Sequence, residues 1–240
     1  MFYLDMNSLS KGFVMLKIRH QARGLICLFC LCVYGLGRGQ AHAATYYVND
    51  TNLAGDVYCS VVGNTTNSGT NAASPKATLQ EIIDAFTLTG GDIVYIDTGI
   101  YTDSAAFYSE GGSAGSYLLI QGSTNYSAGG SVINSGGGVV IYMYASSYIA
   151  FSDLTISGGS DGFGSRFAGY IHSTRIVFRE NTIGARDEAS GGWRFDECLF
   201  INNSSRGAQA NVDWAWKNCV FYNNPTHIYV PYSMAIITNE

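Results

Sequence analysis

The sequence predicts an all-β protein, a parallel β-helix in which short strands coil into a stacked solenoid. Three observations lead to this fold class. Charged residues make up 13% of the chain and hydrophobic residues 47%, which argues against disorder and against a charge-laced helical bundle. The chain has 29 glycines and 3 prolines, as expected for many short strands joined by tight turns. A strand motif also recurs four times in the second half of the chain.

Residues 1–43 are predicted to be a secretory signal peptide. Basic residues precede the apolar run 25–36, and Ala41-His-Ala43 provides a small-x-small cleavage site. The apolar run is shorter than the ~20 residues of a membrane span, so no span is expected after cleavage. Met15 would begin a more ordinary signal, which leaves the true start open. We therefore expect a secreted protein, extracellular or at the cell surface, with the periplasm as the alternative.

The mature chain is expected to be acidic. Residues 1–43 contain five basic residues and one acidic residue, so their removal changes the formal charge from −5 to −9. This balance disfavours nucleic acid, whose binding depends on clustered Lys and Arg. A polyanionic polysaccharide would need a local basic patch or a bridging cation.

The segment 44–91 is expected to hold a strand, a polar loop and a helix. The strand is Tyr46–Val48, and residues 49–74 read as a surface loop rich in Gly, Asn, Ser and Thr. Thr78 and Glu81 form a capping box at the start of the helix. An apolar stripe at i, i+3, i+4 and i+7 follows, and Gly90-Gly91 is the expected stop: Leu79, Ile82, Ile83 and Phe86.

The segment 92–240 is expected to form the coils of the solenoid, in one domain with 44–91. Four hexapeptides align without gaps, each with an aromatic first position, an acidic or amide third position and an apolar sixth position: 151–156, 178–183, 195–200 and 216–221. Short strands with no helix per repeat indicate a β-solenoid, in which like residues of successive coils form ladders. The first column would then be Phe151, Phe178, Phe195 and Trp216.

Two further pairs recur with the repeat. Asn202-Asn203 and Asn223-Asn224 predict a second corner ladder, because Asn tolerates the left-handed conformation and stacked amides can bond to one another. Cys198 and Cys219 share a column and should lie on adjacent coils. A disulfide and a pair of packed free thiols are both compatible with this placement.

The N-terminal segments resemble a known module. Tyr46-Tyr-Val-Asn49, Ala73–Ala85 and Gly91–Thr102, taken with the repeats, are similar to secreted proteins of the pectin-lyase-like superfamily. The resemblance implies a right-handed β-helix whose open end is shielded by the helix of 79–88. It also implies carbohydrate-related roles, among them polysaccharide lyases, glycoside hydrolases and surface proteins of unassigned activity. The superfamily's catalytic motifs have no match, so no catalytic residue is assigned, and the end of the sequence suggests a C-terminal truncation.

One acidic column is a candidate metal site. Asp153, Glu180 and Glu197 would stack at one corner, where like carboxylates repel unless a cation intervenes. Ca²⁺ is therefore the candidate cofactor. The alternative is a solvated corner whose charge Arg179 and Lys217 offset.

The variable loops hold the candidate substrate-binding residues. Arginines and carboxylates there could line a saccharide groove, the alternative being loop solubility: Arg186, Asp187, Glu188, Arg206 and Asp213. Exposed aromatic rings could stack on sugars, the alternative being core packing: Tyr142, Tyr144, Trp193 and Trp214. The leading hypothesis is a polysaccharide-contacting binding or structural module. The alternative is a polysaccharide lyase or glycoside hydrolase with its site in the loops or in missing C-terminal coils, and the oligomeric state stays open.

Overall fold

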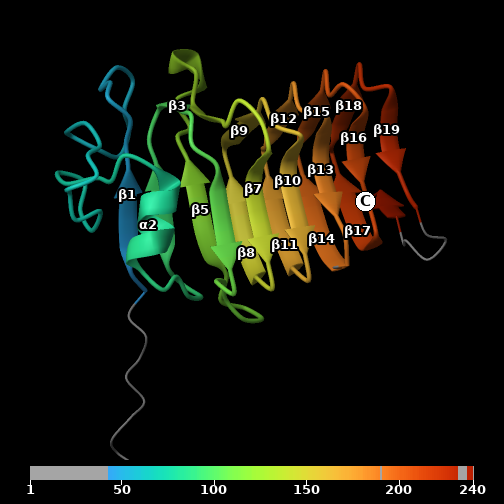
Figure 1. Ribbon diagram of the computed structural model, residues 1–240, viewed down its shortest axis with the longest axis horizontal. Helices are drawn as coiled ribbons and strands as arrows, with labels where there is room; N and C mark the ends of the chain where they lie inside the picture. Colours follow the sequence, from blue (N-terminus) through green and yellow to red (C-terminus); the bar gives the residue numbers. More distant parts are fainter. Residues whose placement is uncertain (1–42, 190, 232–236, 240) are drawn as a thin grey trace, which may run out of the picture. The chain divides into compact units, whose positions relative to one another are not determined.

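The chain is a parallel β-helix. The computed structural model describes residues 43–189, 191–231 and 237–239, and only the backbone of the last three. Each coil passes in turn through three parallel sheets, here called A, B and C, so that like strands stack in sequence order (Figure 1). Residues from Ala43 onward form one compact unit. The all-β class and the solenoid expected from the sequence are confirmed, while the right-handedness stays a prediction.

The three sheets are made of short strands. Sheet A contains β1 (Thr45–Val48), β2 (Ile93–Ile96), β5 (Leu118–Gly122), β8 (Ser147–Ser152), β11 (Gly169–Thr174), β14 (Gly191–Asp196), β17 (Val212–Lys217) and β20 (Ile237–Asn239). Sheet B contains β3 (Gly99–Tyr101), β6 (Ser131–Asn134), β9 (Leu154–Ser157), β12 (Val177–Arg179), β15 (Leu199–Ile201) and β18 (Val220–Tyr222). Sheet C contains β4 (Ala105–Tyr108), β7 (Val139–Tyr144), β10 (Asp161–Arg166), β13 (Ile183–Asp187), β16 (Arg206–Gln209) and β19 (Thr226–Tyr229). A 3-10 turn, η1, spans Tyr126–Ala128.

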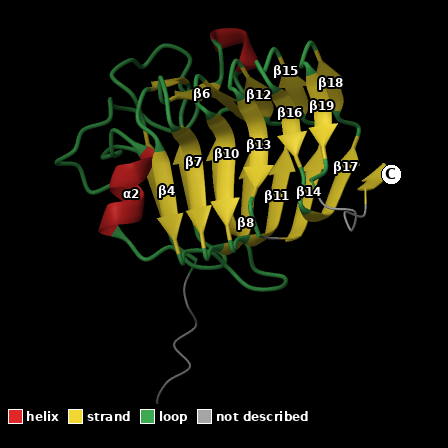
Figure 2. Ribbon diagram, turned by 45° about the vertical axis from the view of Figure 1, so that its right-hand side comes forward, coloured by secondary structure: helices red, strands yellow, loops and turns green. Residues whose placement is uncertain are grey.

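The helix α2 (Leu79–Ala85) begins at the predicted capping box. Thr78 Oγ1 accepts a hydrogen bond from the Glu81 amide, and Glu81 Oε2 accepts one from the Thr78 amide. The helix lies beside β4 at the edge of sheet C (Figure 2), where Gln80 Oε1 accepts the hydrogen bond of Ala106 N. The helix thus supplies an acceptor for a backbone N–H of β4, which has no further strand beside it on this edge of the sheet.

The helix ends earlier than expected. Phe86 is the C-cap and has extended backbone, so the helix stops before Gly90-Gly91. The Phe86 ring packs against Tyr46 at 4.5 Å between centroids, and Leu88 is buried in the core. The chain after Ala85 thus leads both side chains onto the apolar core.

The register differs from the four-row alignment in one row. Phe151 pairs with Ser173, Ser173 with Phe195, and Phe195 with Trp216 in sheet A. Phe178 instead lies in sheet B, paired with Ile156 and Phe200. The sequence alignment was wrong for this row because Phe178 and Glu180 repeat, at the next corner, the alternation that Phe151 and Asp153 show at the first.

The second corner ladder is confirmed and is longer than expected. The Asn203 side-chain amide donates to Asn224 Oδ1 at 2.9 Å, and Asn223 donates to Asn202 Oδ1 at 2.7 Å. Asn181 extends the buried ladder by one coil, and its successive members are 22 and 21 residues apart. Each buried Asn therefore fixes the true length of the repeat.

Candidate functional site

Four residues on the outer face of sheet A share an unusual backbone conformation. Tyr148, Tyr170, Gly192 and Asp213 have φ values of 58°, 56°, 74° and 52°. The strand pairing places them at the same position of successive coils. This left-handed conformation is uncommon for residues other than Gly, and bulky residues in it are outliers that often mark functional sites. We call these four residues the left-handed column.

Two members of this column form a tyrosine stack. The rings of Tyr148 and Tyr170 lie 4.6 Å apart between centroids with 6° between their planes. Tyr117 packs edge-on against Tyr148 and stacks on His172, whose Nε2 lies 3.2 Å from its hydroxyl. Burial, and then the nearby charge of Arg194, lower the pKa of His172. The stack is therefore supported from one side by a neutral aromatic cluster.

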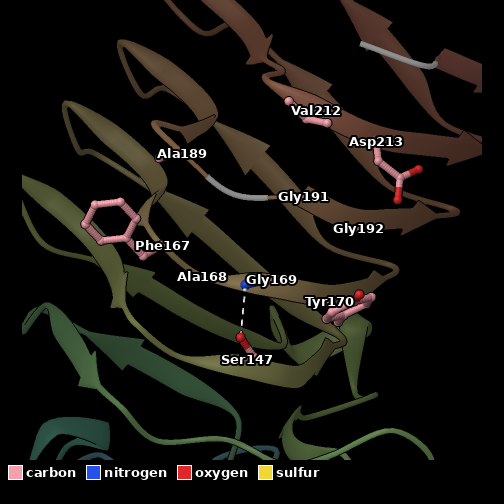
Figure 3. Close-up of a pocket in the computed structure, with 10 residues that line it drawn as sticks. All are labelled: Ser147, Phe167, Ala168, Gly169, Tyr170, Ala189, Gly191, Gly192, Val212 and Asp213. Carbon is pink, nitrogen blue, oxygen red and sulfur yellow. Dashed lines mark hydrogen bonds between the residues drawn. The ribbon is translucent and has the colours of Figure 1, made fainter. Parts of the chain in front are cut away.

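The tyrosine stack ends at a groove of about 490 Å³ where the chain turns from sheet C to sheet A. Its lining includes the partly exposed Gly169 and Gly191 and the buried Gly192, with Phe167 and Tyr170 among the side chains (Figure 3). Ser147 Oγ accepts a hydrogen bond from Gly169 N at 3.2 Å. The surface here, called the corner groove below, combines aromatic rings with accessible backbone.

Asp213 is the one charged residue among the described residues that line the corner groove. Its carboxylate lies 3.4 Å from Arg194 Nη2, and about half of each side chain is exposed. Arg194 Nη1 also donates to the carbonyls of Trp193 and Asp213, both at 3.1 Å. The guanidinium is thus held by three acceptors on β14 and β17 and is not turned freely into the groove.

A smaller groove of about 200 Å³ adjoins Arg194 on the same sheet. It is lined in part by Asp196, Trp216 and Lys217. The Oδ1 atom of Asp196 is buried without a hydrogen-bond partner among the described residues. Sheet A therefore presents two hollows, a mostly apolar one at the end of the tyrosine stack and a more polar one beside Arg194.

The residues predicted to bind substrate lie on two different sheets. Arg186 forms ion pairs with Asp161 at 2.7 Å and with Glu188 at 3.6 Å on sheet C. Burial raises the pKa of Asp161, although Arg186 opposes this shift. Asp187 is buried, and its Oδ1 accepts hydrogen bonds from Ser165 Oγ and Ala189 N.

Arg206 and Asp213 complete the predicted set. Arg206 stacks over the Tyr229 ring at 4.1 Å and hydrogen-bonds to Gln209 on sheet C. Asp213 alone lies on sheet A, at the corner groove. The structure therefore brings Arg186 and Glu188 together and places Asp213 on another sheet.

The three residues of the predicted metal site are not brought together. Asp153 is followed in its column by Arg175, whose Nε and Nη2 bond to the Asp153 carboxylate at 2.7 and 2.8 Å. Glu197 comes next, 4.0 Å from Arg175 Nη1. Glu180 is the left-handed residue directly after β12 in sheet B, one corner further along the coil. A guanidinium therefore supplies the positive charge in this column, and the residues present do not fit a calcium site.

The described part of the chain holds no group of three or more His, Cys, Asp or Glu side chains that could hold a metal ion. Burial acts to raise the pKa of Asp153, but hydrogen bonds from Arg175, Tyr126 and Gln121 outweigh it and hold that pKa below its ordinary value. The carboxylate is thus ionised and fully engaged by protein donors.

Cys198 and Cys219 occupy equivalent positions on adjacent coils, as expected, and both are free thiols. Their Sγ atoms bond to the carbonyls of Ser173 and Phe195, at 3.3 and 3.4 Å. Burial raises the pKa of Cys198, whereas the hydrogen bond between the two thiols lowers the pKa of Cys219.

For two of the four aromatic candidates the structure bears out the alternative of core packing. Trp193 and Trp214 are fully buried and stack in the core at 4.8 Å. Tyr170 was missed, although 51% of it is exposed. The signal that could have found it is the repeat length of 22 and 21 residues shown by the asparagine ladder, which links Tyr148, Tyr170, Gly192 and Asp213.

Within the described residues no helix is long and apolar enough to cross a membrane. The predicted signal peptide falls almost wholly on residues 1–42, outside the described residues, and most of the C-terminal segment 232–240 is outside them as well. The expected boundary between 44–91 and 92–240 stays a prediction.

No protein-family model and no curated protein matches the chain. Two solved structures are similar to it. A crystal structure of the pectate lyase Pel9A is 15% identical, with 75% of this chain and 55% of that chain covered and a TM-score of 0.47. A rhamnogalacturonan lyase is 14% identical, with 82% and 60% covered and a TM-score of 0.44. This chain thus spans little more than half the length of either structure. At these identities and TM-scores the two likenesses assign neither a family nor an activity to this chain.

Proposed function

We propose that this protein is a secreted or cell-surface β-helix that binds polysaccharide through the outer face of sheet A. The observation that carries the proposal is the tyrosine stack, which ends at an open groove. Aromatic rings present flat apolar faces to the C–H faces of sugars, and tyrosine adds a polar hydroxyl. Because Tyr148 holds the Tyr170 ring parallel to itself, little conformational entropy is lost when a ligand packs on Tyr170.

The surroundings of the stack favour sugar over other polymers. Backbone groups of Gly169, Gly191 and Gly192 lie at the corner groove, and Asp213 adds a carboxylate that can accept hydrogen bonds from hydroxyl groups. Nucleic acid is disfavoured by the acidic balance of the chain, 13 Lys and Arg against 18 Asp and Glu. A binding role fits these groups better than catalysis, since Asp213, the one charged residue in the described lining, is already paired with Arg194.

The proposal is tested by affinity electrophoresis of the full chain in gels that contain neutral or acidic polysaccharides. Retardation by at least one polymer is expected, and Tyr170→Ala should weaken it about tenfold, a change of ~1.4 kcal/mol. Tyr222→Ala is the matched control, because Tyr222 is 63% exposed on sheet B, away from the groove. Equal loss in both variants, or no retardation of the unaltered chain, would contradict the proposal.

A second assay separates binding from catalysis. The full chain is incubated with pectate, alginate and chondroitin in the presence of Ca²⁺, and the absorbance of unsaturated products is followed. A binding module leaves the polymers intact. A steady rise in absorbance that Tyr170→Ala reduces would assign this face to a polysaccharide lyase instead.

A further inference from the structure

Two free thiols lie beside one another at the corner between sheets A and B. Cys198 comes directly before β15 and Cys219 directly before β18, and these two strands pair in register, Leu199 with Val220. The Val220 amide donates to the Cys198 carbonyl at 2.9 Å. Because adjacent coils lie ~4.8 Å apart, the Cα atoms of the two cysteines are within the ~4.4–6.8 Å that a disulfide spans.

Both sulfur atoms point toward the preceding coil. Cys198 Sγ lies 3.3 Å from the Ser173 carbonyl, and Cys219 Sγ lies 3.4 Å from the Phe195 carbonyl. Phe195 is in β14, in the same coil as Cys198, so Cys219 Sγ is turned toward the coil of Cys198. The two thiols are hydrogen-bonded to each other. A sulfur–sulfur bond therefore requires chiefly that the Cys198 side chain turn away from Ser173.

The two thiols differ in access and in reactivity. Cys198 is 1% exposed, whereas Cys219 is partly exposed. Burial raises the pKa of Cys198, and the hydrogen bond with Cys198 lowers the pKa of Cys219. The thiolate is the nucleophile in thiol–disulfide exchange, and the reaction depends on access to it. A dissolved disulfide therefore meets Cys219 first, and Cys198 is placed to react afterwards with Cys219.

The pair occurs at one place in its column. The equivalent positions on the two preceding coils are Leu154 and Ile176, which are buried and apolar. A link between Cys198 and Cys219 closes a segment one coil long, and such a closure restricts the opening of that coil.

We propose that Cys219 and Cys198 form a thiol–disulfide exchange site that reacts with a small disulfide such as oxidised glutathione and closes to a disulfide between two coils. The Cys219 thiolate attacks one sulfur of the small disulfide, whose S–S bond breaks, and the first leaving thiolate takes up the proton that Cys219 gave. Cys198 then attacks Cys219 Sγ, the mixed disulfide breaks, and the second leaving thiolate takes up the Cys198 proton. Two protein thiols are oxidised, and one small disulfide is reduced to two thiols.

This inference is independent of the proposed function. The thiols follow the ends of β14 and β17, whereas the corner groove lies at the starts of these strands. Oxidation can therefore be followed without any polysaccharide.

The experiment incubates the native full chain with oxidised glutathione, blocks the remaining thiols with iodoacetamide and maps the peptides by mass spectrometry. The unaltered chain should yield peptides linked through Cys198 and Cys219. Cys198→Ser should stop at a glutathione mixed disulfide on Cys219, and Cys219→Ser should leave Cys198 a free thiol. Cys59 is the internal control: it is also partly exposed, but burial and then the charge of Asp97 raise its pKa, so it should stay unmodified.

Three outcomes would overturn the inference: no link in the native chain, a link that forms only in urea, or a glutathione adduct on Cys198 in Cys219→Ser as abundant as that on Cys219 in Cys198→Ser. Circular dichroism checks that each variant is folded. Should a serine variant fail to fold, iodoacetamide labelling of the unaltered chain decides instead. Cys219 should react at least about tenfold faster than Cys198, and equal rates would contradict the assigned order of reaction.

Discussion

Arg175 reaches across one coil and binds Asp153 through two nitrogen atoms, Nε at 2.7 Å and Nη2 at 2.8 Å. The Asp153 side chain is 1% exposed, so its negative charge depends on this arginine and on Gln121 and Tyr126, which also donate to it. The pair closes the corner between sheets A and B, where Asp153 adopts a left-handed φ of 59°.

Loss of this arginine should destabilise the protein strongly. Arg175→Ala leaves a buried carboxylate without its cation, and we expect the free energy of unfolding to fall by about 3 kcal/mol. Urea denaturation followed by circular dichroism measures the change. Lys217→Ala, which removes an exposed lysine from β17, should change the stability by less than about 0.5 kcal/mol. Similar losses in the two variants would contradict the role of the pair.

The same carboxylate should make the protein sensitive to acid. The pKa of Asp153 is lower in the folded chain than its ordinary value. Its stabilising contribution is therefore complete above the unfolded pKa of ~3.9 and is lost as the pH falls through the folded pKa. In Asp153→Asn the free energy of unfolding should therefore fall less steeply as the pH is lowered. Urea midpoints measured from neutral pH to strong acid test this. An unchanged slope in the variant would assign the acid sensitivity to other groups.

The buried asparagine ladder should contribute to the stability of every coil that it joins. Asn203 is fully buried and donates to the Phe178 carbonyl at 3.1 Å and to Asn224 Oδ1 at 2.9 Å. Asn203→Ala removes these two donated bonds and also the Oδ1 atom that accepts from Asn181 N in the core, and we expect a loss of about 2–3 kcal/mol. Asn202→Gly is the control, because glycine keeps the left-handed φ of 55° and only one exposed hydrogen bond is lost. Stability is measured by thermal melts, and an equal fall in Tm for the two variants would contradict this prediction.

The tyrosine beneath the binding ring should act by positioning it. Tyr148→Ala removes the parallel ring that holds Tyr170 in place, and polysaccharide affinity should fall by about 1 kcal/mol, a factor of ~5. Tyr148→Phe keeps the ring and should bind like the unaltered chain. Affinity electrophoresis with the polymer that the unaltered chain binds best separates the two outcomes. Equal weakening by both variants would show that the hydroxyl, and not the ring, is what matters.

Several elements of the fold follow from the sequence alone. The capping box of Thr78 and Glu81 is a local arrangement, and local hydrogen bonds determine it. The pairs at Asn202-Asn203 and Asn223-Asn224 could be recognised because the same residue type recurs at the true repeat length. The alternation of apolar and polar residues identifies strands because every second side chain of a strand faces the core.

The tertiary structure decided the register and with it the candidate site. Ser173 lies between Phe151 and Phe195, although it shares neither their size nor their ring. Phe178 and Glu180 show the same spacing of an aromatic and an acidic residue, but at the next corner of the coil. The alternation of apolar and polar residues has the same period at both corners, so it cannot distinguish them. Backbone hydrogen bonds between coils choose the pairing, so only they reveal that Arg175 separates Asp153 from Glu197.

The left-handed column shows the same division. The sequence determined that Tyr170 and Asp213 stand among short strands and glycines, and it marked Asp213 as a candidate binding residue. Only the three-dimensional pairing placed Tyr148, Tyr170, Gly192 and Asp213 in one line. The physical reason is that hydrogen bonds between coils decide which residues of successive coils stand beside one another, and these bonds leave no local signal in the sequence.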